Sequence, residues 1–111
     1  MKNARFLLLT LILLLCASQS ALAGGWGVPT TVVSYYVWGD GNAHFRVANN
    51  QNLDNCTVPQ YLTLLKASAN FDKMYATLVA AHVSKTPVSL FYNGCTSNYP
   101  LIIAIAVGGI W

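Results

Sequence analysis

The sequence predicts a small domain that is mainly β with one α-helix. Several stretches are rich in β-branched and aromatic residues and are separated by Gly, Asn, Asp and Pro, which is typical of strands joined by turns. One later stretch, residues 70–85, instead carries apolar residues at spacings of three and four, as one face of a helix does. The chain has 111 residues and contains no internal repeat, which favours a single domain.

Residues 1–23 have the pattern of a secretory signal peptide. Lys2 and Arg5 precede a mostly apolar run of ten residues, and small and polar residues follow up to Ala23. A membrane-spanning helix needs about 20 apolar residues, so an uncleaved anchor is the less favoured alternative. We expect cleavage near Ala23 and a secreted or periplasmic domain of residues 24–111.

Charge argues against a nucleic-acid partner. Removing the leader leaves four cationic residues against three Asp, a formal net charge of +1 instead of +3. Nucleic-acid binding normally requires cations clustered on one face. The cations here are scattered along the chain: Arg46, Lys66, Lys73 and Lys85.

The two cysteines of the mature chain, Cys56 and Cys95, are expected to form a disulfide. An even number of cysteines in an exported protein most simply pairs. The alternatives are a catalytic thiolate beside His44 or His82, or a zinc site. Neither is favoured, since the sequence has no C-x-x-C and no paired histidines.

A β-hairpin is predicted near the start of the mature chain, after a flexible leader at residues 24–29. Residues 30–38 form its first strand, Gly39-Asp40-Gly41-Asn42 its turn, and residues 43–47 its second strand. With Asp40 and Gly41 as the two turn residues, Trp38 would face Ala43, Tyr36 would face Phe45 and Tyr35 would face Arg46. Tyr35, His44 and Arg46 would then lie outside, whereas a shift of one residue would expose Ser34, Tyr36 and Trp38.

The remaining elements complete the fold. Residues 49–55 form a polar loop and residues 61–65 a third strand, with a helical turn as the alternative. A helix follows, with Asn70 as its cap, Asp72 in its first turn, Lys85 in its last and Pro87 beyond its end. Its apolar stripe consists of Phe71, Met74, Tyr75, Leu78, Val79 and His82.

Two strands close the sequence, residues 88–92 and residues 101–107. The second is continuously apolar, which predicts burial on both faces. The resulting order, β-β-β-α-β-β, is that of a small five-stranded OB-like barrel.

Residues 70–106 resemble part of the binding (B) subunits of subtilase-cytotoxin and pertussis-like toxins, and also a related group of uncharacterised small secreted bacterial OB-like proteins. In the toxin subunits, an amphipathic helix runs through a polar turn into a strand opened by Pro-Val, and a Tyr-Pro loop follows. The uncharacterised proteins share a Gly-Cys loop before the last strand. The matching residues are Phe71, Tyr75, Pro87, Val88, Tyr99 and Pro100. The resemblance implies an OB barrel, assembly into five-membered rings and binding of cell-surface glycans, but no individual binding residue carries over.

The residues themselves argue against an enzyme. Acid–base catalysis requires titratable groups held close together, and the chain has three Asp, no Glu and two separated His. We expect His82, on the apolar stripe of the helix, to be a core residue with a satisfied hydrogen bond. No catalytic residue, metal site or cofactor is predicted.

A binding protein is better supported, because the mature chain has more aromatic residues than its core requires. Sugars stack on aromatic faces while polar neighbours bind their hydroxyl groups. The candidate ligand-binding residues are Tyr35, Trp38, His44, Arg46 and Tyr99.

The alternative function is a structural or protein-partner-binding module that does not bind sugars. It would act as a subunit or inhibitor, docking through Ile110 and Trp111. A homo-oligomer is compatible with either function. No stable membrane span is expected.

Overall fold

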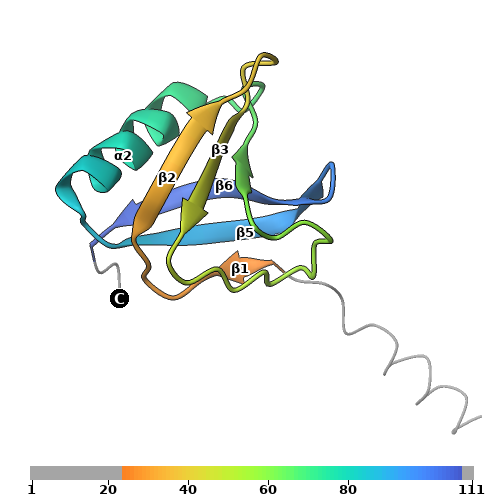
Figure 1. The fold of residues 1–111 in the computed structure, drawn as a ribbon, viewed down its shortest axis with the longest axis horizontal. Coiled ribbons are helices and arrows are strands. Elements are labelled where there is room, and N and C mark those ends of the chain that lie inside the picture. Colours follow the sequence, from red (N-terminus) through yellow and green to blue (C-terminus); the bar gives the residue numbers. More distant parts are fainter. Residues whose placement is uncertain (1–23, 109–111) are drawn as a thin grey trace, which may run out of the picture.

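The computed structural model describes residues 24–108 (Figure 1). The signal peptide predicted at residues 1–23 and the predicted docking residues Ile110 and Trp111 lie outside the described residues. The described chain is mainly β with one helix, as predicted. Its elements are β1 (Gly25–Trp26), β2 (Val32–Val37), β3 (Ala43–Val47), β4 (Leu62–Leu64), α2 (Phe71–Ser84), β5 (Val88–Thr96) and β6 (Tyr99–Val107).

The strands form one mixed sheet of six, in the order β1-β5-β6-β4-β3-β2. Strands β4 and β6 run parallel, and the other neighbours are antiparallel. The end strands β1 and β2 are not hydrogen-bonded to each other, so the sheet is open. The prediction of a closed five-stranded barrel is therefore wrong, although the order of the remaining elements along the chain was predicted correctly.

The sixth strand arises because residues 24–38, expected to form a leader and one strand, pair with two different strands: the first part with β5 and the second part with β3. Thr30 exchanges two backbone hydrogen bonds with Val88 of β5, at 2.8 and 2.7 Å, whereas the next residue, Thr31, accepts one from Ala48 beyond β3 at 3.0 Å. Pro29 has no backbone N–H to continue a ladder. Residues 24–29, expected to be a flexible leader, thus contribute β1 on one end of the sheet, and β2 lies on the other.

The register of the β2–β3 hairpin differs from the expected one by one residue. The backbone N–H of Trp38 donates to the carbonyl of Asn42 at 2.9 Å, which leaves three loop residues rather than two. Gly41, the last of them, has a φ of 89°, as the left-handed position of a three-residue loop requires. The observed pairs are Tyr35 with Phe45, Tyr36 with His44 and Val37 with Ala43.

This register confirms the alternative in which Tyr36 and Trp38 are exposed. Their side chains are 39% and 64% exposed, and Tyr35 instead packs against the core. Because successive side chains of a strand point to opposite faces, one additional loop residue exchanges the buried and exposed sets.

Helix α2 covers the core as its spacing predicted. Figure 1 shows it alongside β2, at one end of β5 and β6. Phe71 and Leu78 are buried, and Met74 and Tyr75 pack against the core. The buried apolar cluster consists of Val32, Ala43, Phe45, Leu62, Leu64, Phe71, Leu78, Ala81, Val88, Leu90, Tyr92 and Ile102.

The ends of α2 are close to the expected positions. Asn70 stands at the N-cap but makes no side-chain hydrogen bond to the helix, and Asp72 lies in the first turn. Lys85 is the C-cap rather than a residue of the last turn, in the left-handed conformation with a φ of 56°. His82, in the last turn, is half-buried, and its Nδ1 is hydrogen-bonded to the carbonyl of Val32 at 2.9 Å, as expected of a satisfied histidine.

Strand β6 is buried on one face only, which corrects the expectation of burial on both. Ile102 is fully buried, but its neighbour Ile103 is 44% exposed. This alternation is typical of a strand with one face on the core. Within residues 24–108, no helix has the length and apolarity to span a membrane.

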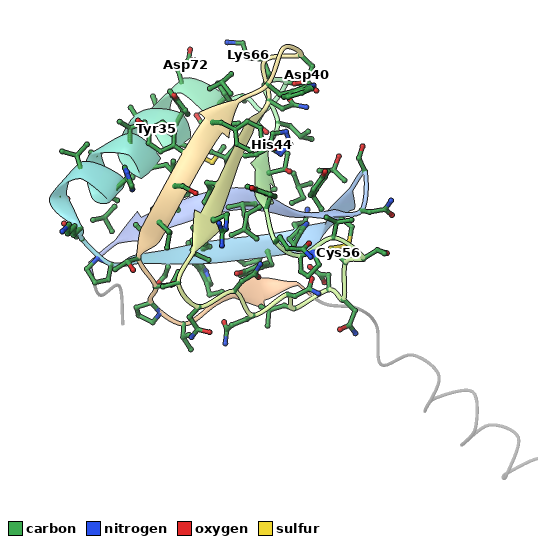
Figure 2. All side chains as sticks on the ribbon, in the orientation of Figure 1. Tyr35, Asp40, His44, Cys56, Lys66 and Asp72 are labelled. Carbon is green, nitrogen blue, oxygen red and sulfur yellow. A yellow bond between two sulfur atoms is a disulfide. The ribbon has the colours of Figure 1, made fainter. Side chains whose placement is uncertain are left out.

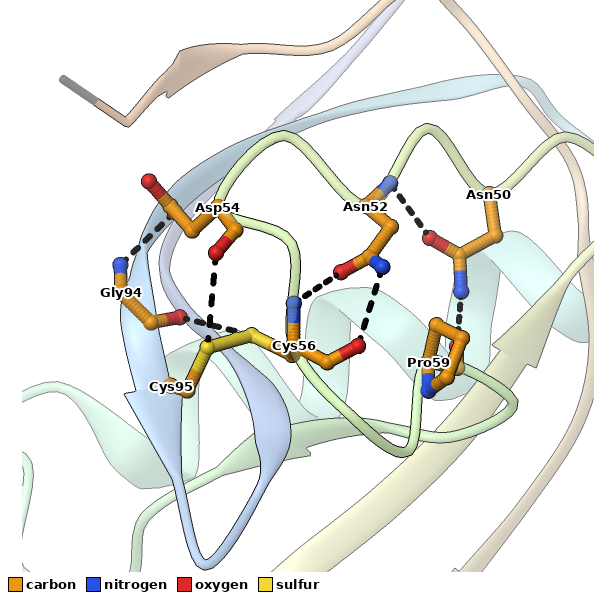
Figure 3. The surroundings of a disulfide bond; sticks show 7 residues. All are labelled: Asn50, Asn52, Asp54, Cys56, Pro59, Gly94 and Cys95. Carbon is orange, nitrogen blue, oxygen red and sulfur yellow. Dashed lines mark hydrogen bonds between the residues drawn. A yellow bond between two sulfur atoms is a disulfide. The ribbon is translucent and has the colours of Figure 1, made fainter. Parts of the chain in front are cut away.

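The predicted disulfide between Cys56 and Cys95 is present, with 5.7 Å between the two Cα atoms (Figure 3). It joins the polar loop that follows β3 to the end of β5. Side chains of this loop fold it onto itself: the carbonyl oxygen of the Asn52 side chain accepts from the N–H of Cys56 at 2.9 Å, and that of Asn50 accepts from the N–H of Asn52 at 3.0 Å. The disulfide indicates an oxidising, extracytoplasmic location.

Candidate functional site

The candidate site is an open hollow of about 360 Å³, which we call the aromatic basin. It lies between the β2–β3 turn and the β5–β6 turn, over the middle of β3 and β4. Figure 2 shows Asp40 at the tip of the first hairpin and His44 further down β3. The basin is lined by Tyr36, Trp38, Asp40, Asn42, His44, Thr63, Thr96, Ser97 and Tyr99.

Tyr36 is at the centre of the aromatic contacts in the basin. Its ring stacks on His44 with centroids 5.1 Å apart, and it meets the rings of Trp38 and Tyr61 edge to face at 6.4 and 5.5 Å. Tyr99 adds a tilted contact to His44 at 5.5 Å. Edge-to-face and offset arrangements of this kind are the favoured ones for aromatic rings. The rings therefore form a supported cluster, from which the indole of Trp38 extends into solvent.

The β2–β3 turn supplies the polar groups on one side of the basin. The carboxylate of Asp40 accepts from the backbone N–H of Asn42 at 2.9 Å and from its side-chain amide at 3.2 Å. The amide oxygen of Asn42 in turn accepts from the N–H of Lys66 at 2.8 Å. These bonds fix the orientation of both side chains. A carboxylate has about four acceptor positions, so Asp40 retains capacity to bind a ligand.

The β5–β6 turn forms the opposite side. Ser97 and Asn98 are its two central residues, with φ values of 48° and 71°, as a type I′ hairpin turn requires. Asn98 fits that conformation well, whereas serine adopts it at some cost. Ser97 places a hydroxyl group at the edge of the basin.

This turn and the end of β5 before it are attached at three points to residues 54–58, at and just after the end of the polar loop, and two of these attachments are visible in Figure 3. The disulfide holds Cys95, the carboxylate of Asp54 accepts from the N–H of Gly94 at 2.8 Å, and the carbonyl of Asn98 accepts from the N–H of Val58 at 2.9 Å. The position of Ser97 relative to Asp40 therefore depends on the loop as well as on the sheet.

His44 forms the floor of the basin and is uncharged at neutral pH. Its Nδ1 is hydrogen-bonded to the hydroxyl of Thr63 at 3.0 Å, and the ring is buried. Burial lowers the pKa of His44, and the nearby carboxylate of Asp40 opposes this shift only in part. Burial also raises the pKa of Tyr36, assisted by Tyr99 and Tyr61, so that its hydroxyl stays protonated.

The lowered pKa of His44 predicts a loss of stability in acid. The unfolded chain, with a histidine pKa of about 6.5, binds this proton more readily than the folded chain. We expect the free energy of unfolding to fall as the pH decreases below about 6.5. Urea unfolding of the wild type and of His44→Asn, whose amide can still reach Thr63, would measure this contribution at pH 7.5 and pH 5. A difference between the two proteins that does not change with pH would contradict it.

The structure brings three of the five sequence-predicted ligand residues into the basin: Trp38, His44 and Tyr99. Arg46 lies next to it, with its guanidinium carbon 5.9 Å from the centroid of the Tyr61 ring.

Tyr35 lies elsewhere, on the face of β2 that packs against α2 (Figure 2). Its ring centroid is 6.0 Å from that of Tyr75 and 5.4 Å from that of His82. The shift in register moves Tyr35 away from the site.

The other lining residues were missed, for different reasons. Tyr36 was assigned to the core by the wrong register. Asp40 and Asn42 were interpreted only as turn residues, although Asp and Asn beside exposed aromatics are also typical of ligand sites. Thr63 and Ser97 carry no local signal, because they reach the basin only through the pairing of β4 with β3 and through the tip of β5 and β6.

The register predicts losses of stability of different size for substitutions at two adjacent tyrosines. Tyr35→Ala removes a ring that packs against the core, so we expect the free energy of unfolding to fall by about 2–3 kcal/mol. Tyr36→Ala removes a ring that is more exposed and packs only within the basin, so the loss should be about 1 kcal/mol or less. Chemical denaturation of the two variants would compare them. Equal losses, or a larger loss for Tyr36→Ala, would contradict the observed register.

Within residues 24–108, no group of three or more His, Cys, Asp or Glu side chains is placed to hold a metal ion. Comparison of the chain with family models, with curated proteins and with solved structures found no match.

Proposed function

We propose that the protein is a small exported, non-enzymatic binding protein that binds glycans in the aromatic basin. The observation that carries the proposal is the combination of an open indole, Trp38, with polar side chains already fixed at the edge of the same hollow. A volume of about 360 Å³ is at the small end of the range for ligand sites and suits one or two sugar rings.

The chemistry of a sugar ring matches both halves of this site. One face of a pyranose carries C–H groups, which gain free energy when they leave water for an aromatic surface such as Trp38 or Tyr99. Its hydroxyl groups act both as donors and as acceptors, and the carboxylate of Asp40, the amide of Asn42 and the hydroxyl of Ser97 offer matching partners. Because these side chains are held by the protein itself, little conformational freedom is lost on binding.

We propose that the chain is related to OB-like modules. If β1 and β2 are counted as two halves of one strand, the order of elements is β-β-β-α-β-β, with the helix between the third and fourth strands. This order supports the proposal, as does the disulfide, which suits a periplasmic or secreted protein. A binding partner on a cell surface would be accessible in that location.

A glycan array with the purified mature chain, followed by titration of the sugars that bind, would test the proposal. Trp38→Ala should reduce the affinity at least tenfold, because it removes the stacking surface, and should leave the thermal unfolding temperature nearly unchanged. Val37→Ala is the matched control, since Val37 is the adjacent exposed residue and does not line the basin. No response to any sugar, or equal binding by Trp38→Ala, would refute glycan binding here.

A second candidate function is binding to another polypeptide. Strand β2 lies at one end of the sheet and carries two exposed valines, Val33 and Val37. An end strand with apolar side chains can pair with a strand of a partner or of a second copy. Analytical ultracentrifugation would test the homo-oligomer: association that Val37→Lys abolishes would support it, and a monomer at all concentrations would exclude it.

A further inference from the structure

We propose that the aromatic basin selects uncharged sugars and rejects acidic ones such as uronic acids. This inference rests on the proposed glycan binding and specifies its ligand class. It follows from the distribution of charge in and around the hollow, from the hydrogen-bonding chemistry of the fixed groups, and from the pairing of the nearest cations with other side chains.

Asp40 is the one acidic residue among those that line the basin, and no Lys or Arg is among them. The remaining polar residues of the basin are amides, hydroxyls and phenols, apart from His44. Burial lowers the pKa of His44, and its hydrogen bond to Thr63 can form with a neutral imidazole. The basin therefore carries one negative charge and no positive charge.

The nearest cations are engaged outside the hollow. The guanidinium of Arg46 lies over the ring of Tyr61, with its carbon 5.9 Å from the ring centroid, and neither residue lines the basin. The ammonium group of Lys66 is 3.9 Å from the carboxylate of Asp72 and 5.0 Å from the centroid of the Phe71 ring. A carboxylate on a bound sugar would thus approach Asp40 without a compensating cation, and like charges in a partly dehydrated site repel.

Asp40 favours ligands that donate hydrogen bonds. An ionised carboxylate only accepts, and two adjacent sugar hydroxyls can donate to it together. Such charge-assisted hydrogen bonds are about twice as strong as neutral ones. The same group that repels an acidic sugar therefore recognises the diol of a neutral one.

Matched sugar pairs provide the test. The methyl glycosides of glucose and galactose would be compared with those of glucuronic and galacturonic acid, which differ only in having a carboxylate in place of a hydroxymethyl group. Nuclear magnetic resonance titrations at pH 7.5 would follow the indole N–H of Trp38. We expect at least one neutral glycoside to bind at least tenfold more tightly than its acid, and this preference to decrease as salt is raised from 20 to 500 mM.

Asp40→Asn removes the negative charge and keeps the shape of the side chain. Its amide oxygen can still accept from the N–H of Asn42, so the turn should persist. Binding of the neutral glycoside should weaken about tenfold, and the preference over the acid should become smaller. Lys73→Gln is the charge control, because it removes an exposed charge on α2 outside the basin and should change neither affinity. Circular dichroism of each variant would confirm that it is folded.

The outcomes distinguish this inference from the proposal of glycan binding on which it rests. Equal or tighter binding of the acids would overturn the selection of uncharged sugars while leaving glycan binding in place. An unchanged preference in a folded Asp40→Asn variant would overturn the role of Asp40. If neither member of any pair binds, both the inference and glycan binding in this basin are refuted.

Discussion

Replacing Cys56 and Cys95 together with serine is expected to lower the free energy of unfolding by about 4 kcal/mol. The bond links positions 39 residues apart, and the chain-entropy model gives a cost of this size for losing a loop closure of that length. Because a small domain has a total stability of about 5–15 kcal/mol, the loss is a large part of it. Urea unfolding of the mature chain would measure it.

The same change should weaken binding in the aromatic basin. Without the disulfide, the β5–β6 turn keeps only the hydrogen bonds from Gly94 to Asp54 and from Val58 to Asn98 as attachments to the polar loop. Ser97 and Tyr99 would then be held less firmly opposite Asp40. A reducing agent should affect the wild type as the double substitution does and should leave the double variant unchanged. A fall of less than 1 kcal/mol in the free energy of unfolding of the double variant would contradict the expected effect on stability.

Phe45→Ala is expected to destabilise the protein by about 3–5 kcal/mol. Phe45 lies in the middle of β3, between β2 and β4, and its side chain is fully buried in the apolar cluster. Truncating a buried aromatic side chain loses its transfer free energy and leaves a cavity that the neighbouring strands fill only in part. Guanidinium unfolding would give the magnitude.

Val37→Ala serves as the comparison for Phe45→Ala, since Val37 is on the neighbouring strand but half of its side chain is exposed. We expect a change within about 0.5 kcal/mol. If the two variants were equally stable, the core would not be centred on β3.

Features that depend on local chemistry could be predicted from the sequence. The spacing of Phe71, Tyr75 and Leu78 predicted helix α2, and Pro87 lies just beyond its end. The predicted export signal and the even number of remaining cysteines predicted the disulfide. The helix and the disulfide each depend on a few residues whose type and spacing are specific to that structure.

The register and the site could not be fixed in this way. The turn sequence around Asp40 and Gly41 suits a loop of two residues or of three, and the choice reverses every side chain of β2. The division between β1 and β2 depends on the partners that Thr30 and Thr31 find in distant strands. The basin unites Trp38 with Tyr99 because β4 lies beside both β3 and β6, which no local pattern specifies.

The two turns that border the basin also bear on how the protein could change over evolutionary time. Asp40, Asn42 and Ser97 belong to hairpin tips and not to the buried apolar cluster. If the basin binds a ligand as proposed, substitutions there would alter which molecule is recognised while the interior that maintains the fold stays intact. Descendants of this protein could therefore come to prefer different ligands while keeping the same fold, through changes in the two hairpin tips.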